Sequence, residues 1–535
     1  MPFQPDLAPV NGSLALSALV ALLPLLTVFV CLGVLKWKAH WACLAGLGVA
    51  LVIAVAAFGM PVGIAIASAT EGAAFGIFPI TWIVLTAIFL FELTVASGHH
   101  DDLMSTFNGI SPDTRVLGVL LAFCFCAVLE ALAGFGAPVA IVGVMLVAIG
   151  FPPLKAAVTV LVGNTFAVPF GAIATPIITG GRLTNIDYGE IGATVASQTS
   201  ALVWVVPLLL LFIMDGWRGL REVWPFALVV GVSYAVITWL SANFISVELT
   251  NMIAGLGSLA IGVVMLRFWR PGGSAEADAE ATPITTSRVA WALFPYLLII
   301  LVFGVTQLVA PVKRWLSGTD LVIGWPGLWQ GQQIMVLTSD GAPSASAKFA
   351  FGWLSSPGTL LLITAVVIGL VYGLPLRTIG KIFIAQVYKL RWTFLTIASV
   401  LALAYVMNLS GQTLTIGHWI AGAGAIFAFL APILGWIGTA VTGSGTSATA
   451  LFASLQQTAA EGIGVEPRLL VAANTVGGAV GKMLSPQTLA IAATAVAGKE
   501  SDMLRKALPW SLGLLVALCL LVGLQSTPVL GWMVP

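Results

Sequence analysis

Long apolar runs, separated by short polar stretches, dominate this chain. A helix that crosses a bilayer needs about 20 apolar residues. Fourteen runs come near that length, and we interpret them as spanning segments: 14–35, 41–58, 76–97, 115–133, 155–180, 190–214, 224–244, 250–268, 291–312, 358–376, 392–410, 416–437, 468–496 and 508–533. Three shorter runs, 61–72, 137–150 and 447–460, are typical of re-entrant or half-crossing helices. The pattern predicts an all-α polytopic membrane protein with about 12–15 transmembrane segments.

Two hydrophilic stretches interrupt this pattern. Residues 270–290 are rich in Gly, Ala, Glu and Thr, which predicts a flexible linker. Residues 313–356 contain four tryptophans among Gly and Pro, and we expect these rings at the membrane interface. Most Lys and Arg clusters fall on one side if the N-terminus lies outside, which makes the linker cytoplasmic and the Trp-rich loop extracytoplasmic. The predicted organisation is therefore a first half, 1–269, the linker, and a second half, 291–535.

Composition excludes several classes of protein. Of 535 residues, 59% are hydrophobic and 8% are charged, too few charges to cover a water-facing enzyme. The net charge of +1 leaves no basic face for nucleic acid. No GxxxxGK[ST] motif is present, so an ATP-driven pump is not expected. Neither a cofactor nor a metal site is predicted, because neighbouring loop residues such as His99 to Asp102 rarely converge on one ion.

The two halves resemble each other in sequence. Residues 133–138 read AGFGAP and residues 442–447 read TGSGTS, with Gly134 and Gly443 309 residues apart. Downstream, NTFAVPFGAIATP (164–176) matches NTVGGAVGKMLSP (474–486) at an offset of 310. Upstream, Ser-Gly at 97–98 matches Ser-Gly at 410–411 at an offset of 313. Three blocks in the same order at a nearly constant offset indicate an internal duplication.

The distribution of Lys and Arg predicts that the two copies have opposite orientations in the membrane. It places helix 76–97 running inward and its counterpart 392–410 running outward. Inverted repeats with Gly- or Pro-interrupted segments at matching positions are typical of secondary transporters, whose substrate site lies near the bilayer midplane. The sequence therefore predicts two inverted-topology repeats with re-entrant or broken helices.

The Gly-x-Gly segments predict helix breaks that can hold an anion. Helices that begin at Ala137 and Thr446 would expose free N–H groups and a positive dipole end to a carboxylate. Backbone that leaves a helix at membrane depth is tolerated only beside protein or a watery cavity. Two breaks that face each other would define a small polar site.

Polar residues inside the apolar runs are further candidates. Glu130 lies one turn before Gly134, and burial favours the neutral form of such an acid, which suits it to carry a proton. Glu71 and Glu92 are weaker candidates, nearer segment ends. Lys482 is expected to pair with Glu130, to pair with a substrate carboxylate, or to reach the interface as a snorkelling side chain. The Asn-Thr pairs are either site residues or polar clamps between helices.

Four motifs and a Trp-Ile pair at 82–83 make the chain resemble the bacterial L-lactate permease family. The motifs are LEALAGFGAPVAI (129–141), VGNTFAVPFGAIATPI (162–177), NLSGQT (408–413) and GKMLSPQTLAIA (481–492). The resemblance runs over nearly the whole chain. It implies a multi-pass protein of the bacterial inner membrane that takes up L-lactate with a proton, often with D-lactate and glycolate. The position after GFG is often Thr in relatives and is Ala137 here, which removes one hydroxyl.

We therefore predict a secondary carrier that binds lactate at the glycine breaks and carries H⁺ on Glu130. The predicted substrate-binding residues are Gly134, Gly136, Asn164, Thr165, Gln412, Gly443, Ser444, Gly445, Thr446, Asn474, Thr475 and Lys482. The main alternative is a sodium-coupled carrier for another small organic anion, because clustered Asn, Ser and Thr oxygens also suit Na⁺. An intramembrane enzyme or a passive channel fits the sequence less well.

Overall fold

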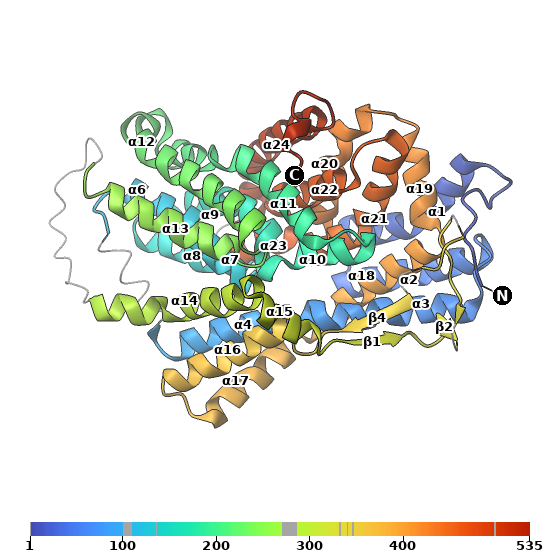
Figure 1. Cartoon of the computed structure of the whole chain (residues 1–535). Helices are drawn as coiled ribbons and strands as arrows, with labels where there is room; N and C mark the ends of the chain where they lie inside the picture. The colour runs from blue at the N-terminus through green and yellow to red at the C-terminus, as the bar shows by residue number, and fades with distance from the viewer. Residues whose placement is uncertain are drawn as a thin grey trace.

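The computed structural model describes residues 2–99, 110–134, 136–269, 286–330, 333–339, 341–344, 347–496 and 499–535. Most of the predicted linker, and His100 to Asp102, lie outside these residues. Helices make up nearly all of the regular structure (Figure 1). The chain has the all-α polytopic architecture that its apolar runs predict.

In the first half, the helices follow the apolar runs. They are α1 (Leu14–Phe29), α2 (Ala39–Ala56), α3 (Val62–Phe75), α4 (Trp82–Ala96), α6 (Thr114–Val119), α7 (Cys126–Ala133), α8 (Ala137–Ala148), α9 (Pro153–Gly163), α10 (Gly171–Thr184), α11 (Tyr188–Val203), α12 (Val206–Phe244) and α13 (Thr250–Met265). Short π-helical or 3₁₀ turns join or extend some of them: η1 (Val30–Val34), η2 (Gly76–Thr81), η3 (Leu120–Phe125) and η4 (Thr165–Phe170).

The second half contains helices and a small amount of strand. Its helices are α14 (Thr286–Leu308), α15 (Ala310–Ser317), α16 (Pro357–Val371), α17 (Leu376–Lys389), α18 (Arg391–Leu409), α19 (Gln412–Ala421), α20 (Ile426–Thr442), α21 (Gly445–Ile463), α22 (Pro467–Lys482), α23 (Pro486–Ala495), α24 (Glu500–Gln525) and the 3₁₀ turn η6 (Gly531–Met533). Its strands are β1 (Leu321–Gly324), β2 (Trp329–Gln330), β3 (Gln333–Ile334) and β4 (Lys348–Phe351).

Within the described residues, nine helical stretches are long and apolar enough to cross a membrane. Five shorter apolar helices of 10–17 residues accompany them. One stretch, Tyr188–Phe244, has 57 residues, far more than one crossing needs. It reverses at Gly216, where φ is 62° and ψ is −146°. The predicted segments 190–214 and 224–244 are its two antiparallel arms.

Glycines allow helices to pack closely, both between the two halves and within the second half. A Cβ at Gly72 of α3 would collide with the backbone of α18 at Leu401, and one at Gly477 of α22 would collide with the backbone of α20 at Pro432. Small residues let helix backbones approach closely inside a membrane. In Figure 1, α18 of the second half lies among α2 and α3 of the first. A helix of the second half is therefore packed between helices of the first half.

The Trp-rich loop is more ordered than its composition suggests. Strand β1 pairs antiparallel with β4, and β2 with β3. The N-terminal segment joins this layer through a bridge between Phe3 and Val336. The loop and the N-terminus therefore lie on the same side of the molecule, as the distribution of Lys and Arg predicts. The strands were not predicted, because each is only two to four residues long.

Two polar contacts show where α9 and α22 begin. Lys155, in the first turn of α9, donates to the carbonyl of Met214, near the reversal of α12. Arg468, in the first turn of α22, lies 3.9 Å from Glu190, in the first turn of α11. Helix α11 and the first arm of α12 run between these two points, so α9 and α22 begin at opposite ends of that arm.

Candidate functional site

Both Gly-x-Gly segments break a helix. Helix α7 ends at Gly134, and α8 begins at Ala137 after Gly136, whose φ is 93°. In the second half, α20 ends at Gly443, with φ of 77°, and α21 begins at Gly445. Residues with a side chain rarely adopt such positive φ values, so glycine is needed at these turns. Each segment forms a helical hairpin with its tip inside the protein.

A broken helix follows each hairpin. After α9, the 3₁₀ turn η4 leads into α10, and Ala172, Ile173 and Ala174 have left-handed φ values of 43°, 54° and 57°. Such a conformation costs about 1–2 kcal/mol for each residue that is not glycine. After α22, residues 483–485 separate Lys482 from α23, which Ser485 caps. The two breaks differ in position, because Asn164 ends α9 whereas its sequence match Asn474 lies inside α22.

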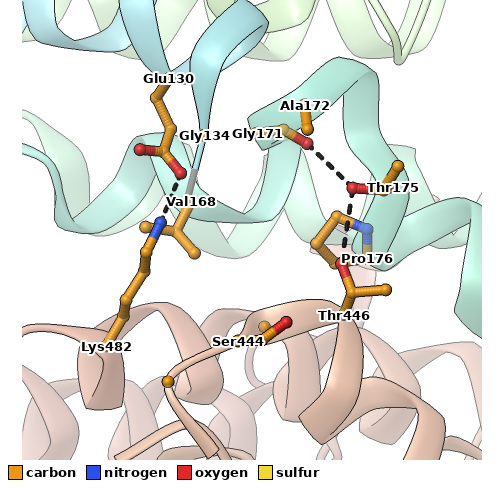
Figure 2. Close-up of a pocket in the computed structure, with 12 residues that line it drawn as sticks. Glu130, Gly134, Val168, Gly171, Ala172, Thr175, Pro176, Ser444, Thr446 and Lys482 are labelled. Carbon is orange, nitrogen blue, oxygen red and sulfur yellow. Dashed lines mark hydrogen bonds and ion pairs between the residues drawn. The ribbon is translucent and has the colours of Figure 1, made fainter. Parts of the chain in front are cut away.

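The hairpin tips and broken helices meet around one small pocket (Figure 2). Its lining includes seven predicted site residues: Glu130, Gly134, Gly443, Ser444, Gly445, Thr446 and Lys482. The remaining lining residues come from η4 and α10: Val168, Gly171, Ala172, Thr175 and Pro176. The two glycine breaks therefore lie together, although they are about 300 residues apart in sequence.

An ion pair crosses this pocket. The Nζ atom of Lys482, at the end of α22, lies 2.5 Å from Oε1 of Glu130, on α7. Figure 2 shows the two side chains pointing toward each other from opposite walls. They are 5% and 1% exposed, respectively. Of the three roles considered for Lys482, the structure shows the ion pair with Glu130. The lysine side chain does not extend to the membrane interface.

Asn164 supports the acid from behind. Its Nδ2 donates to Oε2 of Glu130 at 2.9 Å, and its Oδ1 accepts from the Cys126 thiol at 3.3 Å. Each carboxylate oxygen of Glu130 therefore has a partner, Lys482 for one and Asn164 for the other. A buried carboxylate needs such partners to offset its lost hydration.

Hydroxyl groups form the other side of the pocket. The Thr446 hydroxyl donates to that of Thr175 at 3.4 Å, and Thr175 donates to the Gly171 carbonyl, also at 3.4 Å. Ser444 lies between these hydroxyls and the ion pair in Figure 2, and it accepts from the Ser447 amide as the cap of α21. The Thr175 and Thr446 bonds are long, so a ligand hydroxyl can replace them at small cost.

The first turn of α21 is aimed at this space. Gly445 and Thr446 line the pocket, and a helix start presents free N–H groups and a positive dipole end. Gly136, by contrast, faces Ile491 of α23, where a Cβ would lie 2.6 Å from the Ile491 side chain. Only one of the two predicted helix starts is therefore among the pocket's lining residues.

The other predicted residues lie around or away from the pocket. Asn164 and Thr165 line a smaller neighbouring cavity that shares Val168 and Lys482 with the pocket. Thr475 donates to Val471 within α22. The side chain of Asn474 is fully buried and no partner for it is found among the described residues.

Gln412 lies elsewhere in the fold. Its amide donates to the Ala50 carbonyl of α2 and to the Ser410 hydroxyl. The structure does not bring Gln412 to the pocket, and we leave it out of the site. Its motif was the third block of the repeat, and sequence alone could not separate a packing role from a binding role.

Sequence reasoning missed Thr175. Its only signal was its place before Pro176, in the block that matches Leu-Ser-Pro at 484–486. Its importance arises from the left-handed turn at Ala172 to Ala174, which begins α10 at the pocket.

No metal centre is apparent in the part of the chain that the structure describes. There, no group of three or more His, Cys, Asp or Glu side chains lies close enough to hold an ion. Glu71 is fully buried on α3, away from this pocket, and Glu92 pairs with Lys389 at 3.0 Å.

Comparison with known proteins gives the family. The family described as L-lactate permease matches residues 17–529. The chain is 40% identical to the L-lactate permease of Bacillus subtilis (strain 168), covering 98% of this chain and 99% of that protein. It is 39% identical to the glycolate permease GlcA and 38% identical to the L-lactate permease of Escherichia coli (strain K12), covering 98% of each chain in both cases.

A solved structure, that of the Alcanivorax borkumensis YdaH transporter, matches with a TM-score of 0.46 and 15% identity, covering 87% of this chain and 88% of that one. The sequence relatives are named permeases, which are transporters and not enzymes. The chain is accordingly a multi-pass protein of the bacterial inner membrane, and the resemblance seen in its motifs is confirmed. It belongs to the L-lactate permease family.

Proposed function

We propose that this protein is a secondary carrier that imports L-lactate, and also D-lactate and glycolate, together with H⁺. The names of its relatives support lactate and glycolate as substrates. The buried ion pair between Glu130 and Lys482 in the pocket is the observation that carries the proposal of proton coupling.

Charge balance gives the coupling. Without substrate, the Lys482 ammonium and the Glu130 carboxylate neutralise each other. A lactate carboxylate that takes over Lys482 would leave Glu130 buried beside a second anion. An uncompensated buried charge costs several kcal/mol, so Glu130 takes up a proton instead. The empty site and the site loaded with lactate and H⁺ are both neutral. Only in these two states does the site close and then open to the other side of the membrane.

The remaining lining groups suit a small 2-hydroxy acid. The first turn of α21 and the Lys482 ammonium would hold the carboxylate. Thr175 and Thr446 would exchange their long mutual hydrogen bond for the 2-hydroxyl of the substrate. Asn164 would hold the protonated Glu130 in place. The groups that line the pocket would be held in position by three residues outside the lining: Thr165, Asn474 and Thr475.

We further propose that the two halves are inverted repeats that move in an alternating-access cycle. Opposite starting points of α9 and α22 support the inversion. So does the packing of the segment before α4 against α18, because Gly72 lies against Leu401 and Gly76 against Ala398, which is an antiparallel order.

Uptake into proteoliposomes tests the proposal. Purified protein should concentrate labelled lactate when the lumen is alkaline, and external Na⁺ should make no difference. Glu130→Gln should lose this uphill uptake and keep exchange of lactate for lactate, because its site can bind lactate but cannot take up the proton.

Glu71→Gln is the matched control, since it neutralises another fully buried acid away from the pocket. It should concentrate lactate as the unmodified protein does. Uphill uptake by Glu130→Gln would refute the role of Glu130, and uptake that requires Na⁺ without a pH gradient would favour a sodium-coupled carrier.

A further inference from the structure

A second, larger cavity lies at the end of the molecule where α12 reverses. It measures about 410 Å³ and lies between the start of α9, the end of the first arm of α12 and the first turns of α24. Its walls are apolar, with Val158, Phe212, Ile213 and Trp510 among them. The cavity has no role in the proposed transport site and shares no lining residue with it.

Two lysines lie at this cavity. Lys155 of α9 is half-buried, and its Nζ donates to the Met214 carbonyl at 2.8 Å, which fixes one ammonium there. Lys506 of α24 is exposed. No Asp or Glu is among the described residues that line the cavity. The site therefore offers two positive charges above an apolar interior.

The cavity has charged residues at one level and apolar residues at the next, as a lipid has a charged headgroup and apolar chains. Trp510 follows Lys506 by one helical turn, and its ring meets that of Phe212 edge-on, with centroids 6.0 Å apart. Tryptophan prefers the boundary between headgroups and acyl chains, and lysine the headgroup level. The distribution of Lys and Arg places this end at the cytoplasmic leaflet, where basic pockets between helices recognise anionic headgroups.

We propose that this cavity, between α9, α12 and α24, binds an anionic glycerophospholipid of the cytoplasmic leaflet. Its phosphate meets Lys155 and Lys506, and one acyl chain lies along Val158, Phe212 and Trp510. A soluble phosphate compound would leave the apolar walls uncovered, and a zwitterionic lipid would bring its own cation next to the lysines.

Bound lipid has a structural consequence. Lys155 lies in the first turn of α9, and Asn164 at the end of the same helix holds Glu130. A lipid that joins α9 to α24 restrains the helix that positions the coupling acid. A lipid that binds the folded protein and not the unfolded chain stabilises the folded state by mass action.

Thermal unfolding and native mass spectrometry in detergent test this site. Added phosphatidylglycerol should raise the unfolding midpoint above the value with phosphatidylcholine and give a retained lipid adduct. The double variant Lys155→Gln/Lys506→Gln should lose both effects. Lys155→Arg/Lys506→Arg should keep them, because the charges remain. Glycerol phosphate, which lacks acyl chains, should not shift the midpoint.

A matched control is Arg377→Gln/Lys381→Gln, which removes two exposed charges on α17. It should respond to phosphatidylglycerol as the unmodified protein does. Ile213→Trp places a larger ring among the residues that would hold the acyl chain and should weaken the lipid adduct while both lysines remain. The proposal is overturned if the Lys155→Gln/Lys506→Gln variant keeps the phosphatidylglycerol effect, if Ile213→Trp keeps the adduct, or if glycerol phosphate gives the same shift. None of these outcomes depends on whether lactate is the substrate.

Discussion

Glu130 and Lys482 are 352 residues apart in sequence and form one buried ion pair between the two halves of the protein. Each belongs to a different copy of the predicted repeat, and each lies beside a break in a helix. A buried pair contributes little net stability compared with apolar packing, so stability alone does not account for these two charges. The proposed binding of lactate at Lys482 and the proposed uptake of a proton by Glu130 both depend on this ion pair.

Removing Lys482 should be more harmful than removing both charges. Lys482→Gln removes the cation that pairs with Glu130, so the acid is buried either as an unpaired carboxylate or after taking up a proton. Breaking a buried pair in this way costs about 3–5 kcal/mol. We expect a lower thermal unfolding midpoint and loss of lactate binding. The double variant Glu130→Gln/Lys482→Gln should recover much of the midpoint without recovering binding. Equal midpoints for the single and double variants would mean that the charges do not interact.

The left-handed turn at Gly443 should require glycine. Gly443→Ala forces a side chain into φ of 77° and places its Cβ 2.6 Å from the Gln487 side chain. We expect the tip of the α20–α21 hairpin to shift and the lactate KM to rise at least about tenfold, which corresponds to about 1.4 kcal/mol. Gly424→Ala is the control, because its φ is 64° and the space around it is open. A variant Gly443→Ala with normal transport would argue against a fixed hairpin tip.

The hydroxyls of Thr175 and Thr446 should distinguish lactate from propionate, which lacks the 2-hydroxyl. Thr446→Val and Thr175→Val should each weaken lactate uptake about two- to tenfold and affect competition by propionate little, because a lost hydrogen bond to an uncharged partner costs about 0.5–1.5 kcal/mol. Thr439→Val, a buried threonine outside the pocket lining, should change neither. Equal losses for both acids would assign these threonines to packing.

Acid should loosen the start of α6. Burial raises the pKa of Asp113, but its hydrogen bonds to Arg115 and the charge of that residue outweigh burial and hold the pKa below its usual value. The stabilisation from this carboxylate is therefore present above its ordinary pKa of about 3.9 and is lost as pH falls through the lowered value. Asp113→Asn should be less stable at neutral pH and should lack this acid-dependent loss.

Thermal unfolding between pH 3 and pH 7 in detergent would measure the effect. Asp113→Ala should lose a further ~1 kcal/mol, because Asp113 also caps α6 by accepting from the Arg115 amide. Identical pH profiles for the unmodified protein and Asp113→Asn would rule out this contribution.

Much of the site could be predicted from sequence, since the chemistry is encoded locally. Glycine pairs at the ends of apolar runs predicted the breaks before Ala137 and near Thr446, and an acid inside an apolar run marked Glu130. Lys482 was recognised as a partner, although its choice among three roles needed the fold. A charged side chain is costly inside a bilayer, so an acid within an apolar run leaves a clear signal there.

Other features depend on long-range packing. Gln412 follows a repeated Ser-Gly pair but donates to the Ala50 carbonyl on α2, a contact that no local pattern reveals. Thr175 reaches the pocket because three residues with ordinary side chains adopt left-handed backbone, which their sequence does not favour. Asn164 and Asn474 match in sequence and differ in structure, because the two broken helices are interrupted at different points.

The central claim is that lactate displaces Glu130 from Lys482 and that Glu130 then takes up a proton. Proton uptake on lactate binding tests it most directly: purified protein in a weakly buffered solution, with a pH indicator, is mixed with lactate at matched pH. The account predicts uptake of about one proton for each lactate bound by the unmodified protein, as charge neutrality requires, and none by Glu130→Gln. Lactate binding without proton uptake in the unmodified protein, or equal uptake in both proteins, would contradict it.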